Sequence, residues 1–196
     1  MSEQDLFWAL VLLGGMVVII LAAVAFSRRQ ARLRRAQLQD RFGPEYDRAA
    51  YELGDARKAE KELSARARRV DKLALRELGA AERARFASQW TTVQAQFVDD
   101  PAMAVRSANE LINLVMAARG YPVESFEQRE ADLSVDHAAV IQHYRAARTI
   151  ADQNHHGRAS TEDLRQAMVH YRVLFGDLLQ EQAAQGRSLR HSVAGA

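Results

Sequence analysis

The sequence predicts an all-α protein with an N-terminal transmembrane helix, a long charged helix and then a small helical bundle. Three observations predict this class. The 21 residues from Leu6 to Phe26 carry no charge. Apolar residues in the rest of the chain recur every three or four positions, as they do on one face of a helix. No segment of residues 27–196 combines alternating polarity with β-branched residues, so we expect no sheet.

The uncharged stretch 6–26 has the length of a membrane-spanning helix. At about 1.5 Å per residue it extends ~31 Å, which matches a hydrocarbon core of roughly 30 Å. A cleaved signal peptide is the alternative, because Ala23 and Ala25 form an A-x-A site. Residues 1–5 contain no Lys or Arg, and the apolar stretch exceeds the usual core of a signal peptide. We therefore expect an uncleaved, single-pass anchor.

Arginines follow the uncharged stretch and none precedes it. The positive-inside rule then places residues 1–5 outside the cytoplasm and the C-terminal part inside it, at the cytoplasmic (inner) membrane. An extracytoplasmic C-terminal domain is the alternative. The same arginines could also attract anionic headgroups, although we favour a role in topology alone. These membrane-surface residues are Arg28, Arg29, Arg32, Arg34 and Arg35.

The segments after the anchor divide at Gly43-Pro44. Residues 27–43 are polar and helix-prone, and we expect them to continue the membrane helix as a basic juxtamembrane stalk. Glycine can end a helix, and proline suits the first turn of the next one. An all-α soluble domain follows over residues 44–180, and residues 181–196 are polar enough to predict a flexible tail.

Residues 46–74 predict one long charged helix that ends near Leu78-Gly79. Its apolar and small residues alternate at three and four positions along a single seam. The seam is weak because it is rich in alanine, contains Glu60 and lies beside Gly54. It could pair with a protein partner or form a homodimer, or it could pack within the chain. The seam comprises Tyr46, Ala49, Leu53, Ala56, Glu60, Leu63, Ala67, Val70 and Ala74.

Large aromatic residues mark the next helical segment. Phe86, Trp90 and Phe97 lie on one predicted face, and such faces usually belong to a core. The alternative is that this face, together with Tyr121 and Phe126, forms a partner surface or a pocket for a small ligand or lipid.

Local signals place the ends of the later helices. Asp100 before Pro101 predicts an N-cap, and Gly120 predicts a helix end. Ser134 is expected to cap a helix that ends at Gly157. The segment Ser160 to Asp163 resembles a capping box, with Asp in place of Glu or Gln.

The sequence predicts no catalytic, cofactor or metal site. It has no cysteine, and it lacks the GxSxG, HExxH, Walker A and GxGxxG motifs. None of its histidine pairs has the i, i+3 or i+4 spacing of a helical metal site, although His155-His156 could bind a metal weakly. The six histidines are His137, His143, His155, His156, His170 and His191.

Charge also argues against nucleic acid as a partner. From residue 45 onward the chain has 21 basic and 22 acidic side chains, whereas a nucleic-acid domain would carry a basic surplus. A run of acids interleaved with Arg129 is expected to form a solvated face. These acids are Glu124, Glu127, Glu130, Asp132 and Asp136.

Four strings resemble a group of uncharacterised bacterial proteins described only as hypothetical, membrane or secreted. They are RFGPEYDRA (41–49), QFVDDPAMAV (96–105), RGYPVESFEQREADLSVDH (119–137) and STEDLRQAMVHYRVLF (160–175). The resemblance implies a bacterial host and the cytoplasmic membrane, and it carries no established activity. The description "secreted" conflicts with the charge-based orientation, which we keep.

Taken together, these patterns predict a membrane-anchored, non-enzymatic helical interaction or scaffold module. Its expected partners are the lipid bilayer and a protein. A small-ligand or lipid-binding helical domain is the alternative.

Overall fold

A computed structural model describes residues 3–122 and 125–180 of the chain, without the side chains of residues 3–14, 17, 18 and 180. Within these residues it contains eight α-helices and no strand, which confirms the all-α class. The chain forms two compact units, one ending at Arg41 and one beginning at Phe42. The predicted flexible tail, residues 181–196, lies outside the described residues.

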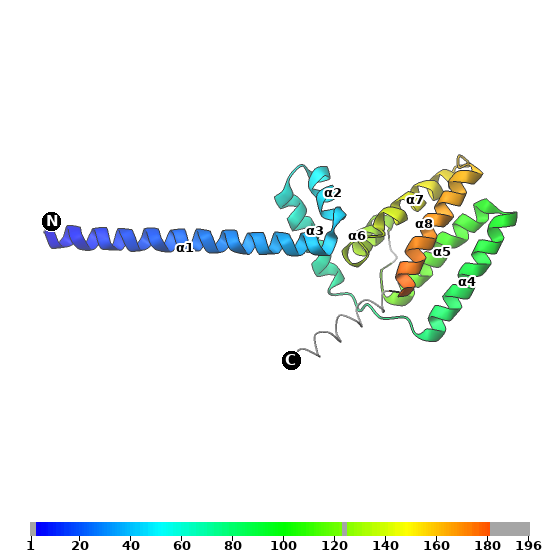
Figure 1. Ribbon diagram of the computed structural model, residues 1–196, viewed down its shortest axis with the longest axis horizontal. Coiled ribbons are helices and arrows are strands. Elements are labelled where there is room, and N and C mark those ends of the chain that lie inside the picture. Colours follow the sequence, from blue (N-terminus) through cyan, green and yellow to red (C-terminus); the bar gives the residue numbers. More distant parts are fainter. Residues whose placement is uncertain (1–2, 123–124, 181–196) are drawn as a thin grey trace. The chain divides into compact units, whose positions relative to one another are not determined.

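The first unit is almost entirely one helix, α1 (Glu3–Phe42). The helix continues from the apolar stretch into the basic stalk without a break, as predicted (Figure 1). Among the side chains that the structure describes, no helix is long and apolar enough to cross a membrane. The side chains of residues 6–14, 17 and 18, which belong to the predicted membrane segment, are not among those described. The transmembrane helix therefore stays a prediction.

The second unit begins with a helical hairpin, and the single helix predicted over residues 46–74 is wrong. α2 (Pro44–Leu53) ends at Gly54, whose φ of 63° is left-handed. α3 (Ala56–Val70) then starts with Asp55 as its N-cap, which accepts a hydrogen bond from the Arg57 amide at 2.7 Å. A glycine in the left-handed region followed by a capping aspartate ends one helix and begins another.

The seam predicted for the long helix instead closes the hairpin. Most of its members are buried in this unit, whereas Leu53 and Ala74 are exposed. The Tyr46 hydroxyl also donates a hydrogen bond to Glu60 Oε1 across the hairpin (2.9 Å). The buried seam residues are Tyr46, Ala49, Leu63, Ala67 and Val70.

Four longer helices form the bundle: α4 (Ala80–Asp99), α5 (Pro101–Arg119), α7 (Ile141–His155) and α8 (Thr161–Gln180). α4 packs on α5, and both α5 and α7 pack on α8, so α8 lies between α5 and α7 (Figure 1). The core between them is apolar and aromatic. It includes Phe86, Trp90, Val105, Ile112, Met116, Tyr144, Tyr171, Leu174 and Phe175.

Three of the predicted helix ends are confirmed. Asp100 accepts a hydrogen bond from the Met103 amide (2.8 Å) and caps α5. Gly120, with a φ of 93°, ends the same helix. Ser160 and Asp163 make the reciprocal bonds of a capping box at the start of α8, at 3.2 Å and 2.8 Å. Aspartate therefore reaches back as glutamate would.

Residues 126–136 form a helix that the sequence did not predict, α6 (Phe126–Asp136). Its N-cap is Ser125, which accepts from the Gln128 amide (3.1 Å), and α6 packs against α3 and α7. The prediction that Ser134 caps the following helix is wrong, because Ser134 is buried inside α6 and donates to the Ala131 carbonyl (2.7 Å).

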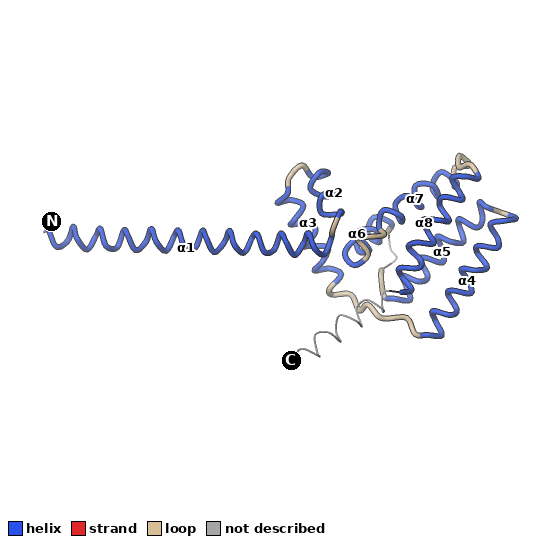
Figure 2. Tube along the Cα trace, viewed as in Figure 1, coloured by secondary structure: helices blue, strands red, loops and turns tan. Residues whose placement is uncertain are grey.

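A loop of residues 71–79 connects the hairpin to the bundle (Figure 2). The predicted helix end at Leu78-Gly79 is wrong, since α3 already ends at Val70. The loop packs against the C-terminal end of α5, where the Arg76 amide donates a hydrogen bond to the Arg119 carbonyl (2.9 Å). A Cβ added to Gly120 would lie 2.7 Å from the Ala74 carbonyl oxygen. Only glycine fits this crossing without a shift of backbone.

Candidate ligand groove between α5 and α7

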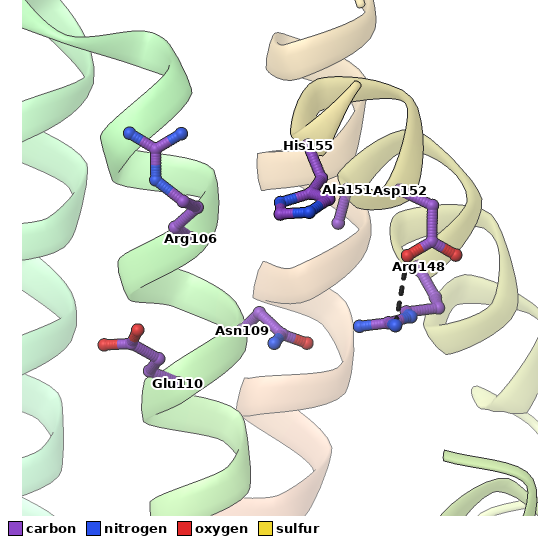
Figure 3. A pocket seen from close by; sticks show the side chains of 7 residues that line it. All are labelled: Arg106, Asn109, Glu110, Arg148, Ala151, Asp152 and His155. Carbon is purple, nitrogen blue, oxygen red and sulfur yellow. Dashed lines mark ion pairs between the residues drawn. The ribbon is translucent and has the colours of Figure 1, made fainter. Parts of the chain in front are cut away.

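A groove of about 280 Å³ opens between α5 and α7 (Figure 3). α5 and α7 each pack on α8 more extensively than on each other. Six of the seven lining residues have polar or charged side chains, whose apolar parts also face the groove. The lining residues are Arg106, Asn109 and Glu110 from α5, and Arg148, Ala151, Asp152 and His155 from α7.

A buried tyrosine of α8 orients the middle of the groove. The Tyr171 hydroxyl donates a hydrogen bond to Asn109 Oδ1 (3.1 Å). Burial raises the pKa of Tyr171, so its hydroxyl stays protonated and remains the donor. With its oxygen engaged, the Asn109 side chain has its NH₂ group available to donate. In Figure 3 the side chains of Asn109 and Arg148 extend toward each other from the two walls.

Charge in the groove is only partly neutralised within the chain. Arg148 pairs with Asp152 at 3.0 Å, and its guanidinium lies 5.2 Å from the centre of the Phe126 ring. Arg106 contacts only the Met103 sulfur (3.7 Å) within the described part of the chain. Glu110 points away from α7 in Figure 3 and makes no ion pair with any described residue.

The groove therefore brings hydrogen-bond donors and acceptors together. Two guanidinium groups, the Asn109 amide and the His155 imidazole border it, together with the carboxylates of Glu110 and Asp152. Guanidinium groups bind carboxylate and phosphate oxygens in pairs, and Arg106 has no carboxylate partner among the described residues.

The structure places the aromatic residues predicted as a partner or ligand face in other surroundings. Phe86 and Trp90 are buried in the bundle core, and the Trp90 ring stacks on Phe175 with centroids 4.8 Å apart. Phe97 is half-buried against the same core. None of these residues lines the groove.

Tyr121 and Phe126 also pack inside the second unit. Tyr121 is buried, and burial raises the pKa of its hydroxyl. Phe126 is half-buried beside Tyr144, with ring centroids 5.2 Å apart. The five aromatic residues therefore contribute to packing at several places and do not form one surface.

The five arginines predicted at the membrane surface all lie on α1, and their side chains are exposed. Their role at a membrane surface stays a prediction. They are Arg28, Arg29, Arg32, Arg34 and Arg35.

The acidic run predicted as a solvated face is exposed only in part, and one of its members is a buried charge. Asp132 is fully buried, and Arg69 of α3 donates to its Oδ1 from Nε at 2.8 Å and from Nη2 at 2.7 Å. Gln128 donates to both oxygens of the same carboxylate at 2.9 Å. Glu124 lies outside the described residues, whereas Glu127 and Asp136 are exposed as predicted.

A larger ion network links four helices, and no local pattern predicted it. Arg145 of α7 donates to both oxygens of the buried Glu45 of α2, at 2.7 Å and 2.8 Å. Arg145 Nε also donates to Glu130 of α6. Arg66 of α3 lies 3.6 Å from Glu45, and Arg48 lies 3.9 Å from both Glu45 and Glu130. These contacts hold the hairpin against α6 and α7.

No known protein family, no curated protein and no solved structure matches this chain.

Proposed function

We propose that this chain is a membrane-anchored, non-enzymatic helical interaction module. Residues 6–26 of α1 form its single transmembrane helix, and the second unit lies in the cytoplasm of a bacterium, where it binds a protein partner. The observation that carries the proposal is the exposure of the apolar side chains on α1. Met16, Ile19, Leu21 and Phe26 are each more than half exposed, at 55%, 70%, 62% and 64%.

Such side chains are costly in water and favourable in lipid. Burial of apolar surface contributes about 25 cal/mol per Å², and a contiguous apolar patch on a protein surface marks contact with a membrane or a partner. The arginines that follow support the orientation, since cations collect on the cytoplasmic side and near anionic headgroups.

The charged groups of the second unit support a binding role over a catalytic one. Its most buried carboxylates, Glu45 and Asp132, are bound by arginines of other helices, and those contacts join helices to one another. Charges used in this way hold the helices in place and are not left available for chemistry.

Membrane attachment is tested by extraction of the full chain from bacterial membranes. We expect the wild type to resist alkaline carbonate and to require detergent. The double substitution Met16→Arg with Ile19→Arg should release the chain, because each arginine in the bilayer centre costs about 2.5–3.5 kcal/mol. The matched control is Met16→Leu with Ile19→Leu, which should stay bound. A wild-type chain recovered in the aqueous phase would refute the anchor.

Sidedness is tested with a single introduced cysteine, because the natural chain has none. Arg158 is exposed in the turn between α7 and α8, so Arg158→Cys leaves the core untouched. We expect a membrane-impermeant maleimide to label it only after the cells are permeabilised. Labelling in intact cells would show the alternative, an extracytoplasmic second unit.

Partner binding is tested by affinity purification of the full chain in mild detergent. We expect a stoichiometric protein partner at low salt. Recovery of the chain alone as a monomer would argue against an interaction module. Recovery as a dimer would favour the homodimer predicted for residues 46–74, whose contacts would then come from the exposed side of the α2–α3 hairpin.

The groove between α5 and α7 favours a second candidate, binding of a small anion. Arg106 and His155 face no carboxylate partner among the described residues, and Arg148, which already pairs with Asp152, adds a second guanidinium. Inorganic phosphate or a short dicarboxylate should raise the melting temperature of the wild type. The shift should be lost in Arg106→Gln with Arg148→Gln and kept in the surface control Arg165→Gln. An equal shift in both variants would exclude the groove.

A further inference from the structure

Two histidines that lie far apart in the sequence meet between α7 and α8. His143 Nδ1 and His170 Nδ1 are 2.9 Å apart. The ring centroids are separated by 5.2 Å, and the ring planes are tilted by 43°. Both side chains are half-buried, so the pair lies at the edge of the bundle and is open to solvent on one side.

The two nitrogens lie at hydrogen-bond distance, and this distance is also close to that between neighbouring ligands on one metal ion. Imidazole nitrogens bind first-row divalent metals at roughly 2.0–2.1 Å. Two such bonds at a right angle place the nitrogens about 2.9 Å apart, whereas the tetrahedral angle preferred by zinc needs about 3.3 Å. Right angles are typical of Cu²⁺ and Ni²⁺.

We propose that His143 and His170 form an interhelical two-histidine site for a divalent transition metal, with Cu²⁺ preferred and Ni²⁺ next. The two Nδ1 atoms are the protein ligands, and water completes the coordination. Copper ranks first because its affinity for nitrogen ligands exceeds that of nickel and zinc in the Irving–Williams order.

The two rings already contact each other through the nitrogens that would bind the metal. Only neutral imidazole binds a metal. Without a metal, the two Nδ1 atoms share a hydrogen bond, and metal binding replaces it.

The site is open rather than enclosed. Among the described residues no cluster of three or more His, Cys, Asp or Glu side chains could hold a metal ion. Two protein ligands leave the remaining positions to water or to an added ligand, so the bound metal is exchangeable. Because the ligands come from α7 and α8, the metal would cross-link two core helices and stabilise the fold.

The chain contains a matched control in its other histidine pair. His155 and His156 are adjacent at the end of α7, are exposed, and have nearly perpendicular rings with centroids 5.5 Å apart. This second pair has the same two imidazole side chains as His143 and His170, and it is present in the same molecule and therefore at the same concentration. His155 and His156 belong to a single helix end, so a metal bound there would not cross-link two helices.

The test uses the chelator-treated full chain in detergent, purified without an oligohistidine tag. CuSO₄ and NiCl₂ are titrated while thermal unfolding is followed. At a metal concentration about 100-fold above the dissociation constant, we expect the wild-type melting temperature to rise by roughly 5–10 °C. The rise should vanish in His143→Ala and in His170→Ala, and persist in His155→Ala with His156→Ala.

A spectroscopic readout makes the result independent of stability. Cu²⁺ bound to the wild type should give an electron paramagnetic resonance spectrum with coupling to two nitrogens, and each single substitution should remove one of them. His170→Asn keeps a polar side chain if His170→Ala fails to fold. The proposal is overturned if the wild type shows neither the shift nor the coupling. A shift that survives in both single variants, or that vanishes with His155 and His156, also overturns it.

Discussion

Arg145 and Glu45 are separated by 100 positions in the sequence, yet they form a two-point ion pair. Arg145 Nη1 lies 2.8 Å from Glu45 Oε2, and Nη2 lies 2.7 Å from Oε1. The two side chains are only 15% and 4% exposed. The planar guanidinium thereby fixes α7 relative to α2 in both distance and direction.

Arg145→Met should destabilise the chain by about 3–5 kcal/mol, because it leaves the buried carboxylate of Glu45 without its strongest partner. Urea unfolding of the detergent-solubilised full chain measures the loss. The control is Arg165→Met, which removes an exposed pair with Glu162 (side chains 52% and 63% exposed) and should have little effect. Equal losses of unfolding free energy in the two variants would contradict the claim that the buried ion pair contributes more than the exposed one.

The contribution of Glu82 should depend on pH. Hydrogen bonds from Arg76, and then from the Gly79 amide, lower the pKa of Glu82 from 4.5 to about 2. A lowered acid pKa stabilises the fold above pH 4.5, and this stability is lost as the pH falls toward 2. The difference in unfolding free energy between wild type and Glu82→Gln should therefore shrink over that interval. A difference that stays constant from pH 6 to pH 2 would refute this assignment.

Gly120→Ala should destabilise by about 3 kcal/mol, because it adds left-handed strain to a clash with the loop backbone. The close neighbour is the Ala74 carbonyl oxygen, 2.7 Å from the added Cβ. Gly157 is the matched control: its φ of 66° is also left-handed, and nothing lies within 4 Å of an added Cβ. Gly157→Ala should cost only about 1 kcal/mol. Urea unfolding distinguishes the two, and equal costs would show that the loop yields.

Trp90→Ala should destabilise by about 3–5 kcal/mol, because the ring is 7% exposed and stacks on Phe175. The substitution removes the Trp90 fluorophore, so the loss of stability is measured by circular dichroism during urea unfolding. Val98→Ala, at a side chain 83% exposed, should change stability by less than about 0.5 kcal/mol. A neutral Trp90→Ala would instead favour a ligand face at this position.

Features encoded by neighbouring residues were predictable. Asp100 before Pro101, Gly120 after a helix and Ser160 three positions before Asp163 all act through bonds within one helical turn. Their roles follow from the local order of residue types. Phe86 and Trp90 were also recognisable as core, because their spacing places them on the same side of a helix.

Features that depend on tertiary contacts were not predictable in the same way. The seam through residues 46–74 continues across Gly54, so the periodicity hides the break that Gly54 and the capping Asp55 make. The packing of α3 against α2 and α6 shows that the chain reverses there. The acids of α6 look solvated until Arg69 of α3 and Arg145 of α7 are brought beside them. His143 and His170 lie 27 positions apart, so a search for helical histidine pairs misses them.

The link between the α2–α3 hairpin and the bundle has a consequence for how the second unit opens. The buried apolar residues of the hairpin lie outside the main core cluster, so ion pairs make a large part of this contact. Salt screens buried ion pairs such as Glu45–Arg145 only weakly, so this contact is limited by how little apolar surface it buries. The hairpin amides should therefore exchange hydrogen for deuterium well before those of α5 and α8, as a separate cooperative unit.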